Sequence, residues 1–278
     1  KIDKEITITG CEGKMVGKAL VKELESRGIY GKRVVILNDT IAVLMGGSAT
    51  LDKSKYDGFI GEVSGTGMNV CCELPLSRIK KLGIDSSDKI LINMEAGTYN
   101  GMEGGDIDKK IDKESKDPGN KIIEKQCSGA YIGEVCRMAL IAGANEGLFS
   151  EASCENILKL KRFDGSVANE IAVGGNPGGI FANDEDNDTA AAICKAIFER
   201  SAESMAITHL AIMLLTGEGK EKPVCIIAEG SLVQHSKYFA PKLTELLDEY
   251  TAKLGRKYEF IVEDGSTVPG SAAAAILN

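Results

Sequence analysis

The sequence of 278 residues predicts a mixed α/β fold, and two observations support this prediction. Short apolar runs such as residues 33–37 and 223–228 are typical of buried strands, and they alternate with longer segments of helical periodicity. Most of these runs end in Asn, Asp, Glu, Gly or Ser, so polar groups should gather at the carboxyl edge of a sheet. Ligands of α/β proteins bind at that edge, which makes it the expected place of a functional site.

Local patterns then give the order of the elements. In residues 14–27 apolar side chains recur at helical spacing, and Gly28 ends the helix. Residues 64–67, Ser-Gly-Thr-Gly, separate two strand-like runs and predict a hairpin. Residues 97–117 are polar and glycine-rich and are expected to form a surface loop, whereas residues 163–187 show no assignable pattern. We expect strands at residues 1–9, 33–37, 59–63, 68–74, 89–94, 223–228 and 258–262, and helices at residues 14–27, 40–47, 120–144, 189–215, 237–254 and 268–277.

Composition narrows the classes of function. The formal net charge of −8 argues against a nucleic-acid-binding surface, and no apolar run reaches the roughly 18 residues that span a bilayer. The eight cysteines form no CxxC motif, and several lie in apolar runs, so we expect buried thiols in a reducing, cytoplasmic compartment. The two histidines, His209 and His235, have no ligand-like neighbours, so no zinc or other protein-held metal site is expected.

Asn38 and Asp39 directly follow the apolar run at residues 33–37. A carboxylate held there by a buried strand points into a cleft and can act as a general base toward a substrate hydroxyl. Asp39 can equally cap the helix that would begin at Thr40. The pattern alone leaves both interpretations open.

Two glycine-containing turns admit a nucleotide-binding interpretation. Successive N–H groups of Gly65, Thr66 and Gly67 can converge on a phosphate, although an ordinary hairpin turn is the better explanation of an isolated Gly-x-Gly. Gly230 and Ser231 can let a nucleotide base approach the backbone closely, although helix capping explains them more simply.

Single polar residues are weaker signals. Glu95 ends a predicted strand and Glu124 opens a predicted helix, and such carboxylates can accept hydrogen bonds from sugar hydroxyls, although solvated surface charge is the commoner explanation. Asn69 is mildly unusual in a strand, which favours a polar role. His209 lies on a predicted apolar helix and is expected to be a core residue, and adjacent Cys71 and Cys72 should face opposite sides of the sheet.

The order of the motifs along the chain is evidence for a family resemblance that single residues do not provide. The chain contains, in sequence, VVILNDT, GEVSGTGMNVCCE, INMEAG, DPGNKIIEKQCSGAYIGEVCR, AEGSL and VEDGS. This series resembles the eukaryotic-type hexokinase family, which includes glucokinase, and the resemblance extends from about Lys4 to Ala274. It implies the actin-like ATPase (ribonuclease H-like) fold, with residues 1–37 as the end of the small domain and residues 38–278 as the large domain.

The resemblance also implies roles for individual residues. Asp39 would be the catalytic base. The sugar contacts would come from Lys4, Asn38, Asn69, Glu95 and Glu124, and the nucleotide contacts from Gly65, Thr66, Gly67, Gly230 and Ser231. Lys4 is placed by counting back from Glu12-Gly13, and Asp3 stands where the family has Thr. The family's D-x-G-G-T-N phosphate loop does not occur in this sequence, so we expect these residues to be part of a longer protein or to be catalytically weak.

The activity that the resemblance implies is phosphorylation of a hexose at its 6-hydroxyl by ATP, with Mg²⁺ held on the nucleotide phosphates. A sugar sensor without phosphoryl transfer, and a kinase of another acceptor such as an acylated amino sugar, remain alternatives. A polymerising structural ATPase is disfavoured by Glu95 and Glu124. Sugar preference and oligomeric state stay open.

Overall fold

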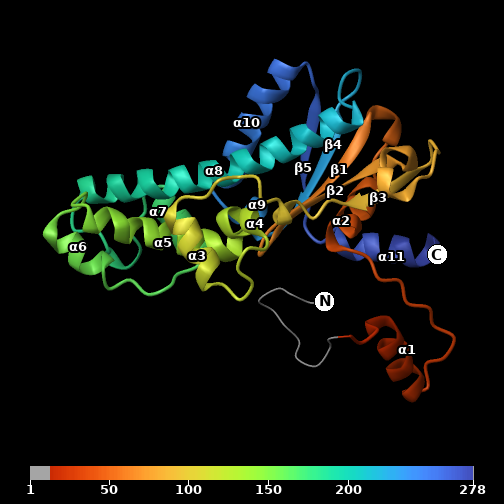
Figure 1. The fold of residues 1–278 in the computed structure, drawn as a ribbon, viewed down its shortest axis with the longest axis horizontal. Helices are drawn as coiled ribbons and strands as arrows, with labels where there is room; N and C mark the ends of the chain where they lie inside the picture. Colours follow the sequence, from red (N-terminus) through yellow and green to blue (C-terminus); the bar gives the residue numbers. More distant parts are fainter. Residues whose placement is uncertain (1–12, 278) are drawn as a thin grey trace.

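A five-stranded sheet organises residues 13–277, which the computed structural model describes (Figure 1). The strand order is β3-β2-β1-β4-β5. The strands are β1 (Gly58–Ser64), β2 (Met68–Pro75), β3 (Lys89–Asn93), β4 (Val224–Glu229) and β5 (Tyr258–Val262). β2 is antiparallel to β1 and β3, whereas β4 is parallel to β1 and β5. The five strands expected between residues 59 and 262 are confirmed, and the strand expected at residues 1–9 lies outside the described residues.

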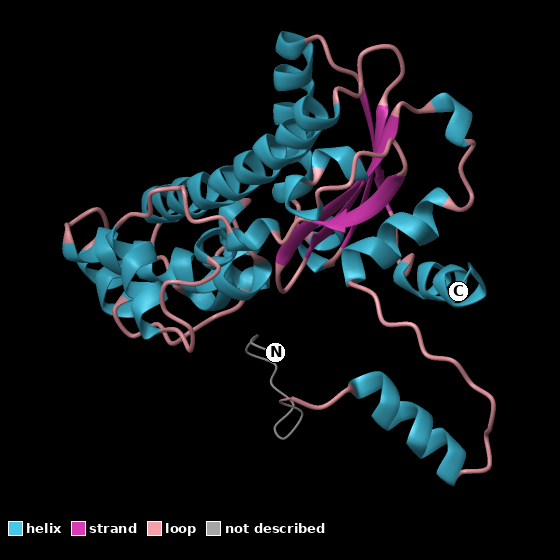
Figure 2. Ribbon diagram, turned by 45° about the vertical axis from the view of Figure 1, so that its right-hand side comes forward, coloured by secondary structure: helices cyan, strands magenta, loops and turns pink. Residues whose placement is uncertain are grey.

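Helices cover both faces of this sheet (Figure 2). α2 and α11 pack on one face, and α8 and α10 on the other, while α3 to α7 form a helical lobe along the first half of α8. No helix within residues 13–277 is long and apolar enough to cross a membrane. The helices are α1 (Val16–Ser26), α2 (Asp39–Ser48), α3 (Asp106–Glu114), α4 (Ile122–Cys127), α5 (Gly129–Asn145), α6 (Glu151–Ile157), α7 (Gly165–Ala172), α8 (Asp184–Thr216), α9 (Ser231–His235), α10 (Phe239–Leu254) and α11 (Thr267–Leu277).

The strands divide their side chains between two hydrophobic clusters. Ile226 in β4 belongs to the large cluster under α8 and α10, and its neighbour Ile227 belongs to the smaller cluster under α2. Cys72 and Cys71 in β2 alternate in the same way, which confirms that they face opposite sides of the sheet. Burial raises the pKa of both thiols to about 12, so both stay protonated at neutral pH.

A hydrogen-bonded polar chain interrupts the large apolar cluster. Glu62 in β1 and His209 in α8 are both fully buried, and His209 Nε2 lies 2.8 Å from Glu62 Oε2. The Ser64 hydroxyl donates to Glu62 Oε1 at 2.5 Å. His209 is therefore a core residue, as its helix pattern predicted, although its partner is an acid. A buried carboxylate without such partners would cost several kcal/mol, so each member depends on the others.

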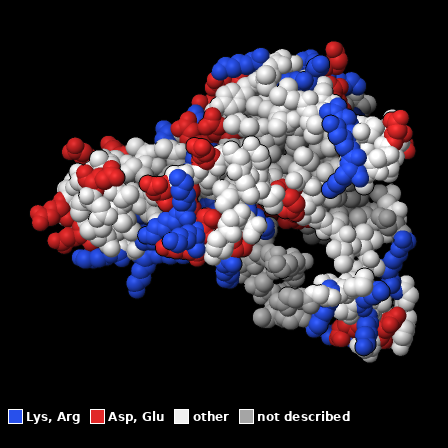
Figure 3. Space-filling model, in the orientation of Figure 1, with Lys and Arg blue, Asp and Glu red and all other residues white. Residues whose placement is uncertain are grey.

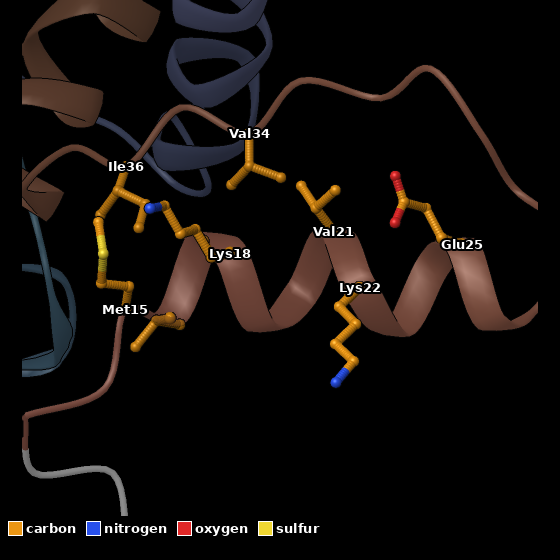
Figure 4. Close-up of a pocket in the computed structure, with 9 residues that line it drawn as sticks. Met15, Lys18, Val21, Lys22, Glu25, Val34 and Ile36 are labelled. Carbon is orange, nitrogen blue, oxygen red and sulfur yellow. The ribbon is translucent and has the colours of Figure 1, made fainter.

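Residues 33–37 are the main disagreement with the sequence prediction. They are extended but belong to no strand, and Ile36 is 68% exposed. An apolar run becomes a buried strand only when a neighbouring strand pairs with it, and here the segment lies against helix α1 instead. The two elements border an open groove of about 540 Å³, with Met15 beside Ile36 and Val21 beside Val34 (Figure 4).

Other differences come from helix ends that the sequence does not mark strongly. The single helix expected at residues 120–144 is two, because Ser128 is extended (φ −82°, ψ 159°) and ends α4 before α5 begins. The loop expected at residues 97–117 contains α3. Most residues of α3 are charged, so the apolar periodicity that marks a helix is weak there. The unassigned residues 163–187 contain α7, and α6 has no counterpart among the predicted elements.

Charged side chains are mixed over most of the side of the molecule shown in Figure 3. Acidic side chains gather at the left-hand end of that view, where α6 and the start of α8 lie. Glu151, Asp184 and Glu185 occupy the first turns of these helices. Negative charge at a helix N-terminus is stabilising, which gives this acidic end a structural explanation.

The buried pair gives a stability prediction. His209→Leu should lower the free energy of unfolding by about 3–5 kcal/mol, because it leaves the Glu62 carboxylate buried without its partner. The double variant Glu62→Leu with His209→Leu should recover most of this loss, because it removes both buried polar partners together. Urea unfolding followed by circular dichroism measures both effects. Lys159→Met, which breaks an exposed ion pair with Glu155, should change stability by less than about 1 kcal/mol. A double variant no more stable than His209→Leu would contradict this account.

Candidate active site

The glycine turn, Gly65-Thr66-Gly67, connects β1 and β2 at the carboxyl end of β1. Ser64 pairs with Met68, and the N–H of Gly65 donates to the carbonyl of Gly67 at 3.0 Å. The expected hairpin is therefore confirmed. β4 runs parallel to β1, so the turn after β4, at Gly230 and Ser231, lies at the same edge of the sheet.

Two helix starts clamp the glycine turn through backbone contacts. Gly129, which begins α5, donates its N–H to the carbonyl of Gly65 at 2.8 Å, and a Cβ at Gly129 would meet that oxygen at 2.6 Å. Gly230 has φ +123°, and a Cβ there would meet the carbonyl oxygen of Ser64 at 2.5 Å. A side chain at either position would push the turn away, so glycine is required at both for steric reasons.

A pocket of about 320 Å³ opens beside this turn. Its walls come from the glycine turn and from α5, α7 and α9, and two predicted nucleotide contacts, Thr66 and Ser231, line it. Its volume falls at the lower end of the range for small-molecule sites. The remaining lining residues are Gly129, Ala130, Asp164, Gly165, Ser166, Asn169, Leu232, His235 and Ser236.

Hydrogen bonds fix the polar side chains of this pocket. Asp164 caps α7, and its hydrogen bond from the Ser166 side chain is the main cause that lowers the pKa of its carboxyl group. Asn169 Oδ1 accepts hydrogen bonds from the Ser236 hydroxyl at 2.8 Å and from the N–H of Lys237 at 2.9 Å. The amide oxygen of Asn169 is thereby oriented, and its amide nitrogen must face another direction.

Asn38 and Asp39 lie at the start of α2 and not at the end of a strand, which corrects the sequence prediction. The helix begins at Asp39, and Asn38 is its N-cap, since Asn38 Oδ1 accepts the N–H of Thr40 at 3.0 Å. Asp39 Oδ1 accepts the same N–H at 2.9 Å. Asp39 is exposed, so its carboxylate can meet a ligand while the helix start holds its backbone.

Asp39 lies on the same face of the sheet as Asn69. The thiol of Cys71 donates a hydrogen bond to the carbonyl of Thr40. Burial is the main cause that raises the pKa of this thiol, and the negative charge of the nearby Asp39 carboxylate raises it further. Cys71 and Asn69 are two residues apart in β2 and so share a face. A Cβ at Gly61 would meet the Thr40 carbonyl at 2.7 Å, and three residues of strand, about 10 Å, separate Gly61 from Ser64. Asp39 therefore lies on the order of 10 Å from the glycine turn.

Asn69 begins a hydrogen-bonded chain of two amide side chains and one carboxylate. Asn69 Nδ2 donates to Asn93 Oδ1 at 2.7 Å, and Asn93 Nδ2 donates to Glu95 Oε1 at 2.8 Å. Asn69 Oδ1 accepts the N–H groups of Val70 and Ala96 at 2.8 and 3.1 Å. Glu95 is exposed and has a left-handed backbone with φ +49°. The structure thus joins two predicted sugar contacts through a third residue, Asn93.

Glu124 completes what we call the polar cluster, which is Asn69, Asn93, Glu95 and Glu124. Glu124 is 8% exposed, and its Oε2 accepts the N–H of Met68, next to Asn69, at 3.2 Å. A Cβ at Gly97, two residues after Glu95, would meet Glu124 Cβ at 3.1 Å. Glu95 and Glu124, which single-residue reasoning left as surface charges, therefore flank the start of β2 together.

Sequence reasoning missed several residues of this region. Asn93 stands in the INMEAG motif, two residues before the predicted Glu95, and its strand-end location was the available signal. Gly129 opens α5 in the SGAY part of another motif, but its contact with Gly65 spans 64 residues and leaves no local pattern. Lys4 lies outside the described residues. Within residues 13–277, no group of three or more His, Cys, Asp or Glu side chains could hold a metal ion.

Sequence comparisons agree with this geometry. The family model described as hexokinase matches residues 59–277. Human hexokinase-1 is 29% identical over 283 residues, which cover 90% of this chain and 30% of that protein. Hexokinase-2 of Schizosaccharomyces pombe is 28% identical over 289 residues, which cover 98% of this chain and 62% of that protein. The chain thus spans less than two thirds of the length of either relative.

Solved structures show the same fold. Hexokinase from Schistosoma mansoni, complexed with glucose, matches with a TM-score of 0.77 at 22% identity, over 96% of this chain and 63% of that one. A ROK family glucokinase from Streptomyces griseus, in complex with glucose and AMPPNP, matches with a TM-score of 0.55 at 14% identity, over 93% and 72%. The expectation of an actin-like ATPase fold is confirmed. From the match of its family model over most of the sequence, the chain belongs to the hexokinase family.

Proposed function

We propose that the protein is a sugar kinase that transfers the γ-phosphoryl group of ATP to the 6-hydroxyl of a hexose. The observation that supports this most is the arrangement at one sheet edge. The polar cluster and the glycine turn are joined by β2, whose first residues Met68 and Asn69 contact the cluster and directly follow the turn. Groups that suit a sugar and groups that suit a phosphate therefore lie next to each other at the start of β2.

The polar cluster suits a sugar because a hydroxyl group both donates and accepts hydrogen bonds. The carboxylates of Glu95 and Glu124 accept hydrogen bonds, and the amides of Asn69 and Asn93 hold one of them in place. Asn38 is already engaged in capping α2, so any contact it makes with a sugar would use its amide nitrogen. The Schistosoma mansoni relative binds glucose, which supports the assignment.

The glycine turn and the adjoining pocket suit a nucleotide. Thr66 in the turn and Ser231 at the start of α9 both line the pocket, and the N-terminal ends of α5 and α7 border the pocket. The backbone contacts of Gly129 and Gly230 hold the turn in one conformation before any ligand binds. Mg²⁺, carried on the nucleotide phosphates, would neutralise charge that develops during phosphoryl transfer.

The chain's own groups would then do three things. The polar cluster fixes the hexose, and the clamped turn fixes the phosphates, so positioning supplies most of the rate enhancement. Asp39 accepts the proton of the 6-hydroxyl as that oxygen attacks the γ-phosphorus in line. Backbone N–H groups of the turn stabilise the negative charge on the transferred group.

A sugar sensor without phosphoryl transfer is the second candidate. The observation that favours it is the polar cluster, whose carboxylates and amides can bind a sugar whether or not a nucleotide is present. A sensor binds the hexose but releases no ADP. Assaying hexose binding and ADP release on the same native protein, across hexoses and amino sugars, separates the two candidates and a kinase of another acceptor.

Asp39→Asn should lower the turnover number of the native protein by about 10²- to 10⁴-fold, because an amide cannot accept the hydroxyl proton. Its effect on the dissociation constant of the hexose should be small, since the amide oxygen can still accept the N–H of Thr40. A coupled assay of ADP release and isothermal calorimetry measure the two quantities. The matched control is Asp85→Asn, an exposed aspartate on a distant loop. Turnover of Asp39→Asn equal to that of the control would remove Asp39 from the mechanism.

Gly230→Ala should raise the KM for ATP at least tenfold while the KM for the hexose changes little. The added methyl group collides with the Ser64 carbonyl and displaces the glycine turn, whereas Asn69 and Asn93 of the polar cluster are held by the pairing of β2 with β3. Steady-state kinetics with each substrate varied in turn checks this. Gly147→Ala is the control, because Gly147 also has positive φ (+78°) but no atom within 4 Å of its would-be Cβ. Equal effects on both KM values would count against a turn that serves the nucleotide alone.

A further inference from the structure

Three fully buried polar side chains lie in line beneath the glycine turn. Glu62 and Ser64 are two residues apart in β1 and therefore point to the same face of the sheet, which α8 covers. His209 comes from α8 itself, and hydrogen bonds run from His209 through Glu62 to Ser64. We call these three side chains, each 0% exposed, the buried polar chain. None of them has a role in the proposed function.

The surroundings of the buried polar chain are apolar, so stability does not explain it. Glu62 pairs with Val70 in β2 and with Ala228 in β4, and both neighbours belong to the large hydrophobic cluster. A buried pair such as Glu62 and His209 is seldom more stable than apolar side chains of similar volume, because each polar group loses its hydration. What the buried polar chain does instead is hold Ser64 in place.

Ser64 is the last residue before the glycine turn, and its backbone is held unequally on its two sides. It pairs with Met68 in β2, whereas the register of β1 with β4 ends one residue earlier, at Val63 and Glu229. On the β4 side the carbonyl of Ser64 meets Gly230, where a Cβ would lie 2.5 Å from the oxygen. Such a steric contact opposes approach strongly but opposes separation only weakly. Ser64 therefore needs an attractive constraint as well.

The hydrogen bond between the Ser64 hydroxyl and Glu62 supplies that attraction. Ser64 Oγ lies 2.5 Å from Glu62 Oε1, and both side chains are shielded from water, which strengthens the bond. The other carboxylate oxygen of Glu62 is held by His209, which is 147 residues away in sequence. The point at which the chain leaves β1 and enters the glycine turn is thus fixed from the core of the molecule.

We propose that Glu62 and His209 are positioning residues for the nucleotide. They hold Ser64, and through it the glycine turn, in the place where the N–H groups of the turn meet the phosphates of ATP. This inference rests on the proposed role of the glycine turn and adds two residues that touch no ligand. Their loss should weaken nucleotide binding selectively, because Asn69 and Asn93 of the polar cluster are held by the pairing of β2 with β3.

The first test removes the hydroxyl group alone from the native protein. Ser64→Ala should raise the KM for ATP about fivefold or more, the loss expected when one buried hydrogen bond no longer fixes the turn. The dissociation constant of Mg·ATP, measured by calorimetry without hexose, should rise by the same factor. The dissociation constant of the hexose should change little.

Ser153→Ala is the matched control. Ser153 is also 0% exposed, and its hydroxyl donates to a buried carboxylate, Asp186 Oδ2, at 2.6 Å. Asp186 lies in the first turn of α8 and His209 in the last third, about 35 Å further along this helix (Figure 1). Because the Ser153 hydroxyl also accepts the N–H of Ala182, Ser153→Ala should lower stability at least as much as Ser64→Ala. It should leave the affinities for both substrates unchanged.

The second test uses the double variant Glu62→Leu with His209→Leu, for which we predict recovered stability. This variant removes the acceptor of the Ser64 hydroxyl, so its KM for ATP should rise as in Ser64→Ala although its free energy of unfolding approaches that of the parent. Glu62→Gln keeps an acceptor oxygen for the hydroxyl and should retain most of the nucleotide affinity. A merely structural role predicts instead that nucleotide affinity follows stability in every variant.

Parent-like affinity for Mg·ATP in Ser64→Ala and in the double variant would overturn the inference and leave the proposed function intact. Equal losses of hexose and nucleotide affinity would also overturn it, because the effect would then not be confined to the glycine turn. A parent that binds Mg·ATP but releases no ADP would overturn the kinase proposal, and calorimetry would still decide the role of Glu62 and His209. A parent that binds no nucleotide would overturn both.

Discussion

The backbone contact at the glycine turn is the constraint on which the rest of the site depends. Three segments far apart in sequence meet there, and at Gly129 and Gly230 there is no space for even a methyl group. The turn cannot move without displacing α5 or α9, both of which are packed into the same core as the sheet. Its geometry is therefore set by the whole fold, and ligand binding need not provide the energy to order it.

The first residues of β2 transmit this order to the polar cluster. Met68 follows the turn and donates its N–H to Glu124, and Asn69 holds Asn93. Under the turn, Ser64 is tied through Glu62 to His209 on α8. The strand ends around the turn are thus bound on one side by the polar cluster and on the other by the buried pair of Glu62 and His209. Both proposed ligand sites share one rigid support, so their separation is fixed by covalent geometry.

Local patterns predicted what local forces determine. The hairpin of β1 and β2, the strands β3 to β5 and the helices α1, α2, α10 and α11 follow from periodicity and turn chemistry. The prediction of a strand at residues 33–37 was wrong because strand formation depends on a pairing partner, which the apolar run itself does not encode. The site was reached through the order of motifs and not through single residues, because its contacts join positions such as Asn69 with Asn93 and Met68 with Glu124, 24 and 56 residues apart. The left-handed backbone of Lys121 was not predicted, because backbone strain leaves no mark on composition.

Glu95 and Lys121, which have a left-handed backbone, show how the fold prepares this site. Each such residue costs about 1–2 kcal/mol, a sizeable part of the 5–15 kcal/mol that stabilises a typical domain. Neighbouring bonds maintain both: the Thr98 hydroxyl donates to the Glu95 carbonyl at 2.7 Å, and the N–H of Lys125 donates to the Lys121 carbonyl at 3.1 Å. This free energy is lost during folding, so the backbone of Glu95 and of Lys121 is ordered before any ligand binds. A hexose that binds to the polar cluster, as we propose, then loses less free energy to ordering of the protein, and more of each hydrogen bond appears as affinity.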